Sequence, residues 1–242
     1  VELTCEEARG TRVELSFAEL VHPDGSLNKK NLRTARAVDV YTCSGKGVET
    51  WHPRFTFHGF RYVEVRGLSG PPTPETLTGC VIQSDTAQAG QFHTSSDQLN
   101  RLWKSILWTQ KSNYITVPTD CPQRDERAGW TGDAVFFMPT AMWNMQMPAF
   151  YEKRMKDLTD SQHEDGASVN QAPVVMPARN GAGWGDELML LPWYFYRFYG
   201  DREILETNYD ALKRYADWLI GRAGELETGI GKLPRSFGDH LS

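Results

Sequence analysis

The chain has 242 residues, a formal net charge of -5 at pH 7 and 40% hydrophobic residues. That length is enough for one large domain or two ordinary ones. The negative net charge gives no electrostatic reason to expect a nucleic-acid partner. No apolar stretch approaches the ~20 residues that a membrane-spanning helix needs. We therefore expect a globular protein with neither nucleic acid nor membrane as a partner, and composition leaves open whether it forms a homo-oligomer.

The four cysteines, Cys5, Cys43, Cys80 and Cys121, are widely spaced, with no CxxC pair and no histidine at zinc-finger spacing. This pattern predicts neither a structural zinc site nor a disulfide scaffold, and we expect no metal and no cofactor. The chain starts at Val1 without an initiating methionine, and its last residues close no regular element. We read it as an internal fragment of a longer protein, whose cellular compartment the two ends do not reveal.

The first part of the chain, residues 1–91, has the pattern of short β-strands. TRVELSFAEL (residues 11–20) alternates apolar and polar side chains, as a half-buried strand does. HPDGSL (residues 22–27) has the composition of a turn. Several short strands separated by turns predict an antiparallel β-sandwich. Further strands are expected in AVDVYTC (37–43), RFTFHGFRYVEVRG (54–67) and GCVIQSD (79–85).

The hydrophobic period changes to about 3.6 residues near Phe92, which predicts helices in the second part of the chain. Residues 94–114 open with serine and aspartate, which cap helices, and then carry apolar side chains at three- and four-residue steps. The connection at 163–187 has no period, and a loop of that length is often functional. Helices joined by short loops predict an α/α array. The other helices are expected at 134–145, 148–162, 186–200 and 202–223.

The segment VPTDCPQRDERAGWTGDAVFF (residues 117–137) places acidic residues densely between two apolar flanks. Its prolines and glycines predict a loop that leads into the next helix. Carboxylates carry most of the chemistry of glycoside hydrolysis, and a proton donor must be neutral near the operating pH. Glu126, with Trp130 four positions on, is the candidate donor, although Arg124 and Arg127 favour its charged form. From spacing alone, a surface loop with internal ion pairs is an equal alternative.

The stretch DCPQRDERAGWTGD (residues 120–133) resembles the signature segment of bacterial α-L-rhamnosidases, the inverting glycoside hydrolases of family 78. Residues 24–65 are similar to the β-sandwich domain that precedes the catalytic barrel in that family. FHTSSDQLNRLWKS, GWGDE, YGD and FGDHLS resemble successive landmarks of its six-hairpin α/α barrel. The resemblance covers essentially the whole chain. It implies a multidomain α and β architecture: an antiparallel, concanavalin-like β-sandwich in residues 1–91, then the N-terminal part of an incomplete six-hairpin α/α barrel in residues 92–242.

The resemblance implies a role for each matching residue. Glu126 matches the general acid that protonates the departing glycosidic oxygen. The implied substrate is a glycoside or polysaccharide that contains L-rhamnose, and aromatic walls would exclude water from the methyl group of this sugar. His240 stands in FGDHLS where the family usually has tryptophan, which puts the substrate preference in doubt. The positions implied to bind the sugar are Asp120, Arg124, Trp130, Asp133, Trp184 and His240.

Structural roles are alternatives at several of these positions. Asp120 and Asp133 could cap a turn and a helix, and Arg124 could orient a carboxylate. Trp130 and Trp184 could be plain core residues. The structural and the sugar-binding roles differ in which groups the side chains contact.

Two neighbouring carboxylates and one histidine are expected to be structural. Asp186 and Glu187 fit the start of a helix, and His58 belongs to the sandwich. Inversion also needs a second carboxylate, roughly 6.5–9.5 Å from the acid, to activate water. In the family this residue lies downstream, so the fragment alone is expected to be inactive. Two hypotheses stay open: a piece of a working α-L-rhamnosidase, and a non-catalytic sugar-binding protein on the same scaffold or a related hydrolase acting on another deoxy sugar.

Overall fold

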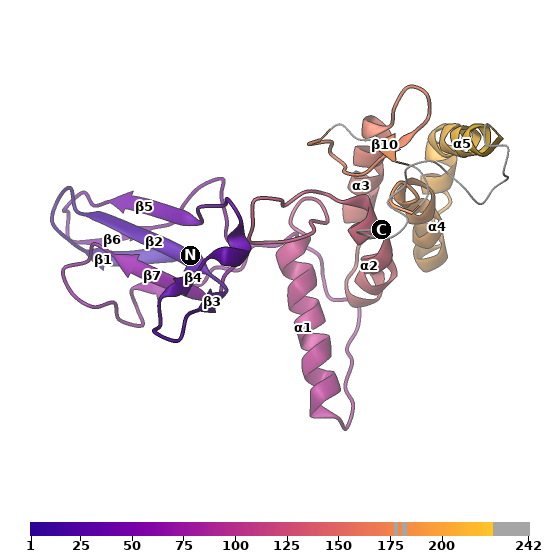
Figure 1. The fold of residues 1–242 in the computed structure, drawn as a ribbon. Coiled ribbons are helices and arrows are strands. Elements are labelled where there is room, and N and C mark those ends of the chain that lie inside the picture. The colour runs from indigo at the N-terminus through magenta and orange to yellow at the C-terminus, as the bar shows by residue number, and fades with distance from the viewer. Residues whose placement is uncertain (177–178, 181–182, 225–242) are drawn as a thin grey trace. The chain divides into compact units, whose positions relative to one another are not determined.

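The structure, a computed structural model, describes residues 1–176, 179–180 and 183–224. The chain forms two compact units, one of strands and one mainly of helices (Figure 1). The β unit contains Val1–Ile82 and Cys121–Arg127, and the helical unit contains Gln83–Asp120 and Ala128–Ser242. The predicted order, antiparallel strands followed by helices, is therefore confirmed.

The β unit contains two three-stranded antiparallel sheets, with strand orders β6-β1-β8 and β5-β2-β7. The HPDGSL turn joins the short hairpin β3-β4, and Gly25 takes the positive φ of 85° that the turn requires. The strands are β1 (Glu2–Glu6), β2 (Arg12–Ala18), β3 (Leu20–Val21), β4 (Leu27–Asn28), β5 (Val38–Thr42), β6 (Val48–Trp51), β7 (Tyr62–Arg66) and β8 (Leu77–Thr78), and a 3-10 turn covers Lys30–Leu32.

The core of the β unit lies between the two sheets. Val13, Leu15 and Phe17 of β2 are buried as the alternation in TRVELSFAEL predicts, but Ser16 and Ala18 are buried too, so the alternation holds only in the first half of the strand. They belong to the same hydrophobic cluster as Leu3 of β1, which comes from the other sheet. Side chains from both inner faces thus form one core, as in a sandwich. The structural role expected for His58 is confirmed: its ring stacks on Phe17, and Nε2 lies 2.9 Å from Oδ1 of Asp39.

Two strand predictions were wrong in part or whole. Residues 79–85 form no strand, and only β7 lies within the range predicted at 54–67. The side chains of Val81 and Ile82 are exposed, so this apolar pair has no sheet face to cover. Valine and isoleucine favour strands only where a half-buried pleated surface receives them.

The helical unit begins close to the predicted boundaries. Ser96 caps α1 by accepting a hydrogen bond from the backbone N–H of Leu99 at 3.4 Å, and Gly200 ends α4 with a φ of 72°. α2 starts earlier than predicted, so Asp133 lies in its first turn and not on the preceding loop. The helices are α1 (Asp97–Asn113), α2 (Thr131–Asn144), α3 (Pro148–Ser161), α4 (Glu187–Tyr199) and α5 (Glu203–Gly224).

The long connection between α3 and α4 contains a structure that the sequence pattern did not predict. It forms a two-stranded antiparallel ribbon, β9 (Ser168–Val169) with β10 (Arg179–Asn180). β9 is buried and packs near α3. Two-residue strands are too short to produce a readable alternation, which is why this segment looked irregular.

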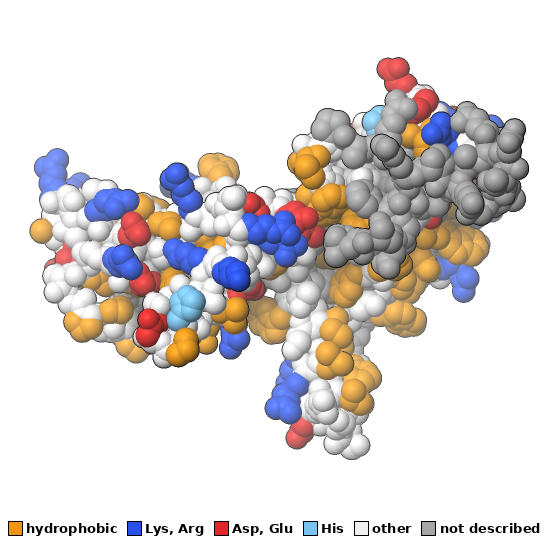
Figure 2. Space-filling view, viewed as in Figure 1, with side chains coloured by type: hydrophobic (Ala, Val, Ile, Leu, Met, Phe, Trp, Pro, Cys, Tyr) orange, Lys and Arg blue, Asp and Glu red, His pale blue; other side chains and the backbone are white. Residues whose placement is uncertain are grey.

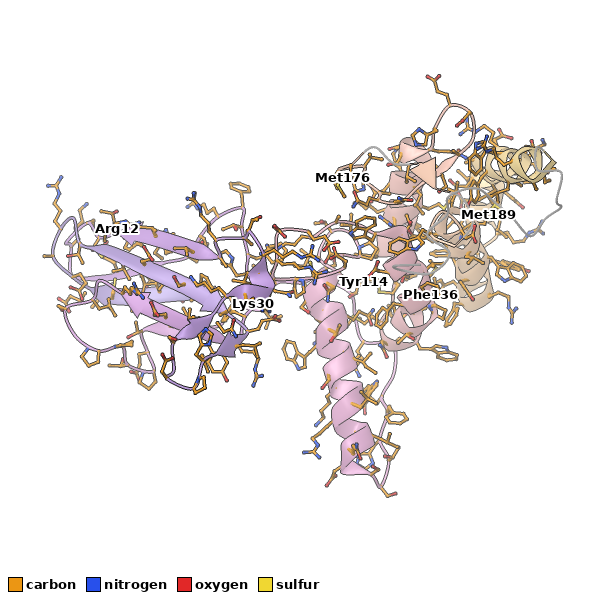
Figure 3. All side chains as sticks on the ribbon, in the orientation of Figure 1. Arg12, Lys30, Tyr114, Phe136, Met176 and Met189 are labelled. Atoms are coloured by element: carbon orange, nitrogen blue, oxygen red, sulfur yellow. The ribbon has the colours of Figure 1, made fainter. Side chains whose placement is uncertain are left out.

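A second hydrophobic core joins helices α1 to α5. Tyr114, which follows α1 (Figure 3), stacks on Phe150 of α3 with ring centroids 5.0 Å apart. Other large side chains of this unit are exposed, including Phe136, Trp143 and Trp193, and Figure 2 shows hydrophobic side chains on its surface. Such exposure is typical of a face that packs against more protein. None of the helices in the described part of the chain has the length and apolar character needed to cross a bilayer.

Candidate active site

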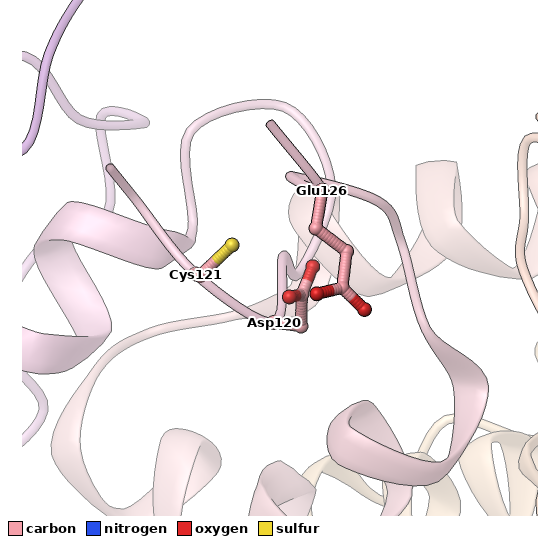
Figure 4. A group of neighbouring side chains, drawn as sticks. All are labelled: Asp120, Cys121 and Glu126. Atoms are coloured by element: carbon pink, nitrogen blue, oxygen red, sulfur yellow. The ribbon is translucent and has the colours of Figure 1, made fainter. Parts of the chain in front are cut away.

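The acidic loop between α1 and α2 is held by its own backbone. The backbone N–H of Ala128 donates to Oδ1 of Asp120 at 3.0 Å, and the N–H of Asp120 donates to the carbonyl of Ala128 at 3.3 Å. Asp120 therefore does fasten a turn, as its structural alternative predicted. Figure 4 shows the side chains of Asp120, Cys121 and Glu126, all of which this loop carries.

Arg127 anchors the part of this loop that belongs to the β unit. Its Nη1 donates to the carbonyl of Phe57 at 2.7 Å, and its guanidinium lies 4.9 Å from the centroid of the Phe57 ring. The residue takes a positive φ of 41°, a conformation that side chains other than glycine rarely adopt. The two contacts attach this part of the loop to the segment that carries Phe57.

Glu126 is the carboxylate that two arginines approach. Its Oε2 accepts hydrogen bonds from Nη1 of Arg33 at 2.7 Å and from Nε of Arg124 at 3.0 Å. The orienting role that was the alternative for Arg124 is thus present in the structure. Both bonds end on the same oxygen, and no described residue donates to Oε1. The carboxyl group is also only partly buried, with 23% of the side chain exposed, so ligands can reach it.

Arg33 is a site residue that the sequence did not reveal. It lies just after the 3-10 turn of the β unit, 93 positions away from Glu126. Its neighbour Thr34 donates from both backbone N–H and hydroxyl to Oδ2 of Asp125, which lowers the pKa of that carboxyl. NLRTARA has no local signal for this contact, because the partner is brought close only by folding.

Trp130 and Trp184 are brought together in the helical unit. Their rings meet edge to face, with centroids 5.3 Å apart and an angle of 78° between the planes. The ring of Trp184 lies over Gly132, where an added Cβ would come within 2.4 Å of Cδ2. Both side chains keep partial exposure, so the pair is a wall rather than buried core. Edge-to-face tryptophans present a broad apolar surface on which a sugar ring can pack.

The GWGDE segment that carries Trp184 is fixed from two sides. Oδ2 of Asp186 accepts from the backbone N–H of Gly183 at 2.8 Å, and Oδ1 accepts from the hydroxyl of Tyr215 at 2.9 Å. Glu187 begins α4 and pairs with Arg154 of α3. The expectation that both acids start a helix and serve the structure is confirmed.

The remaining sequence-predicted residues are placed as follows. Asp133 is exposed in the first turn of α2, and His240 lies outside the described residues. Arg124 and Glu126 belong to the β unit, whereas Asp120, Trp130, Asp133 and Trp184 belong to the helical unit. That these two groups line one pocket stays a prediction.

In the β unit, a partly exposed carboxyl group accepts hydrogen bonds from two guanidinium groups, and in the helical unit two partly exposed tryptophans meet edge to face. A model of the bacterial α-L-rhamnosidase six-hairpin glycosidase domain matches residues 87–242, and a model of the bacterial α-L-rhamnosidase concanavalin-like domain matches residues 1–83. The first match includes Asp120, Glu126, Trp130 and Trp184.

Curated and solved proteins agree with these family models. The chain is 46% identical to an α-L-rhamnosidase of Streptomyces avermitilis over 90% of its length, and 41% identical to one of Formosa agariphila over 96%. It is also similar to a crystal structure of the Streptomyces avermitilis enzyme complexed with L-rhamnose, with a TM-score of 0.92 and 43% identity over 99% of this chain. The α-L-rhamnosidase structure from Dictyoglumus thermophilum gives a TM-score of 0.88 and 39% identity over 92% of the chain.

The match covers only part of each relative. The chain spans 21% of the Streptomyces avermitilis relative, 25% of the Formosa agariphila relative and 23% of the rhamnose-bound structure. Along this chain the concanavalin-like domain comes first and the six-hairpin glycosidase domain second. The chain belongs to the bacterial α-L-rhamnosidase family, of which it contains the concanavalin-like domain and part of the six-hairpin glycosidase domain.

Proposed function

We propose that the protein containing this chain removes terminal α-L-rhamnose from rhamnosides or rhamnose-containing polysaccharides, with inversion at the anomeric carbon. The observation that carries this proposal is the family match over residues 87–242, which includes the acidic loop and the tryptophan pair. A relative that is 43% identical was crystallised with L-rhamnose. The same sugar is the ligand that this chain would bind.

Glu126 is the general acid in this proposal. The two guanidinium groups of Arg33 and Arg124 both contact Oε2, so the transferable proton belongs on Oε1. When Oε1 gives this proton to the departing glycosidic oxygen, the negative charge that appears on the carboxylate is already solvated by two arginines on Oε2. Charge-assisted bonds of this kind are about twice as strong as neutral ones. The pair therefore stabilises the carboxylate that proton transfer leaves, whereas the neutral acid must form against the same two charges.

Sugar recognition is assigned to one aromatic pair and three polar residues. Trp130 and Trp184 provide the apolar wall for the ring face and the C6 methyl group of rhamnose. Asp120, Arg124 and Asp133 supply the polar groups that read the hydroxyls, as the resemblance implies. The side chain of Asp133 is exposed in the first turn of α2, where a ligand can reach it. Inversion also requires a second carboxylate that activates water.

The test is turnover of an aryl α-L-rhamnoside by the full-length protein, with anomeric configuration of the released sugar followed by NMR. Wild-type protein should release the β-anomer first, as inversion requires. Glu126→Gln should lower kcat by ~10²–10⁴ for substrates that need protonation of the leaving group. Glu64→Gln is the matched control, because Glu64 is also a partly exposed glutamate paired with one arginine in the β unit. Binding of L-rhamnose without any turnover would replace the hydrolase with a sugar-binding protein.

A further inference from the structure

A buried ion pair of the helical unit contacts the backbone next to Trp130. Arg154 of α3 and Glu187 of α4 have side chains that are 1% and 0% exposed. Nε of Arg154 donates to Oε1 of Glu187 at 2.9 Å, and Nη2 donates to Oε2 at 2.5 Å. This two-bond geometry uses one edge of the guanidinium and leaves further N–H groups available.

The remaining N–H groups of Arg154 hold two loop carbonyls. Nη2 donates to the carbonyl of Gly129 at 3.1 Å, and Nη1 donates to the carbonyl of Ala172. Gly129 immediately precedes Trp130, and Ala172 follows Gln171. Arg154 therefore contacts both of the chain segments that meet at Trp130.

Those two segments form a short ladder. The backbone N–H of Ala172 donates to the carbonyl of Gly129 at 3.0 Å, and that of Thr131 donates to the carbonyl of Asn170 at 2.9 Å, with Trp130 opposite Gln171. The packing leaves no space for adjustment, because a Cβ on Gly129 would lie 2.2 Å from the carbonyl oxygen of Ala172. The direction in which Trp130 leaves the backbone is set by this ladder.

Stability alone is a weak reason for such a pair. Removing two charges from water is costly, and replacing a buried pair by apolar residues of similar volume is often neutral or stabilising. Burial raises the pKa of Glu187, and the charge of Arg154 opposes that rise. An apolar pair would fill the same space, but it would leave the carbonyls of Gly129 and Ala172 without these donors. The contribution that only arginine makes here is the pair of hydrogen bonds to the carbonyls of Gly129 and Ala172, which hold the two strands of the ladder.

We propose that Arg154 and Glu187 are positioning residues, which fix the ladder of 129–131 against 170–172 and so hold Trp130 edge to face against Trp184 for sugar binding. The sugar-binding part of this inference rests on the proposed function. The structural part does not, because it concerns only the ladder and the ring pair. Glu187 orients the guanidinium, and the guanidinium orients the two loops.

The test compares a paired apolar replacement with a matched control in the full-length protein. Arg154→Met with Glu187→Leu removes the clamp while filling its volume. Gln110→Met with Asn144→Leu is the control: these two residues are also buried and hydrogen-bonded to each other at 3.1 Å, and no described contact joins them to the ladder. Urea unfolding measures stability, and hydrogen exchange measured on peptides that contain Thr131 and Ala172 measures the ladder.

The Arg154→Met, Glu187→Leu variant should have the urea midpoint of the wild type, but its ladder amides should exchange at least ~10-fold faster. The control variant should leave the exchange rate of these amides unchanged. Misplacement of a binding group by about 1 Å costs on the order of 10²-fold, so kcat/KM for an aryl α-L-rhamnoside should fall by about that factor. The proposal is overturned if the apolar pair preserves both ladder protection and kcat/KM. It is also overturned if exchange accelerates equally throughout the helical unit, because the pair is then a general stabiliser.

Arg154→Lys covers the case in which the double variant does not fold. Lysine keeps the charge but replaces the planar fork by a single ammonium, which cannot reach Glu187 and both carbonyls in the same way. Exchange that accelerates more in the ladder than in the rest of the helical unit is the expected result, and wild-type exchange contradicts the clamp. If wild-type protein hydrolyses no rhamnoside, the proposed function fails, while the exchange measurements still decide whether Arg154 holds the ladder.

Discussion

Trp184 packs against Trp130 only because the residue beneath it, Gly132, has no side chain. An added Cβ at Gly132 would lie 2.4–2.6 Å from three carbon atoms of the Trp184 indole. The two tryptophans come from segments separated by α2, α3 and the β9-β10 ribbon, and they meet with ring centroids 5.3 Å apart. The close approach of the Trp184 ring to the backbone of Gly132 thus determines the position of the aromatic wall.

Gly132→Ala should therefore weaken sugar binding. The new methyl group would push the Trp184 ring away, and overpacking of this kind costs about 1–3 kcal/mol. That exceeds the gain of about 1 kcal/mol that alanine brings in a helix. We expect a lower free energy of unfolding and a higher KM for an aryl α-L-rhamnoside.

Gly221→Ala in α5 is the control for this change, since no atom beyond the neighbouring backbone of its own helix lies within 4 Å of the added Cβ. It should stabilise the protein by roughly 0.5–1 kcal/mol and leave KM unchanged. Equal behaviour of the two alanine variants in urea unfolding and in KM would show that Trp184 does not depend on Gly132.

Tyr215→Phe should loosen the segment that carries Trp184. Tyr215 is fully buried, and burial raises its pKa, so its hydroxyl stays a neutral donor to Oδ1 of Asp186. Without this bond, the hydrogen bond from the backbone N–H of Gly183 to Oδ2 still holds the carboxylate. The expected cost is about 1 kcal/mol of unfolding free energy, with an increase in KM and little change in kcat. Tyr209→Phe, an exposed tyrosine on the same helix, should alter neither quantity.

The sequence was most informative where a pattern repeats locally. The alternation at Val13, Leu15 and Phe17 predicted a strand, and the change to helical spacing near Phe92 predicted the second unit, because both patterns follow from one buried face. The prediction of a strand at 79–85 was wrong because the apolar side chains of this segment have no sheet face to cover.

Contacts between distant segments were beyond the reach of local patterns. The sequence motif identified Glu126 as the candidate acid, but Arg33, which holds its Oε2, is 93 positions away. Arg154 reads as an ordinary polar residue of an amphipathic helix, yet it is buried against Glu187. These groups come together only in the folded chain, so the spacing of residues along the sequence does not predict their contacts.

The pH dependence of the β unit should be controlled in part by Glu49. The hydroxyl of Tyr41 donates to Oε2 at 2.6 Å, and the backbone N–H groups of Ser44 and Gly45 donate to the same carboxylate at 2.9 Å. These bonds lower its pKa from 4.5 to about 2. Because the folded pKa is depressed, the ionised group stabilises the fold above pH 4.5, and this contribution is lost as the pH falls toward 2.

Hydrogen exchange in peptides from β5 and β6, measured between pH 2.5 and 6 and corrected for intrinsic rates, checks this expectation. Glu49→Gln should reduce protection at pH 6 and converge with the wild type at the acidic end. Tyr41→Phe, which removes one donor, should reduce the difference only partly. A gap between wild type and Glu49→Gln that stays constant across this range would contradict the assignment.

If Glu126 is the proton donor, the loss of activity in Glu126→Gln should depend on the leaving group. Since the donor neutralises charge on the departing oxygen, its contribution to the rate increases with the pKa of the leaving group. In the full-length protein, Glu126→Gln should lower kcat by ~10²–10⁴ for alkyl rhamnosides, whose alkoxide leaves poorly, and much less for rhamnosides of acidic phenols. A plot of log kcat against leaving-group pKa should therefore become steeper in the variant.

Asp133→Asn is the comparison that separates chemistry from binding. A lost contact to a sugar hydroxyl does not depend on the leaving group, so this variant should lower kcat/KM by a similar factor for every rhamnoside and keep the wild-type slope. Asp133 is exposed in the first turn of α2, so the substitution should leave stability within about 0.5 kcal/mol. If Glu126→Gln also kept the wild-type slope, Glu126 would be a binding contact, and the proton would have to come from another group.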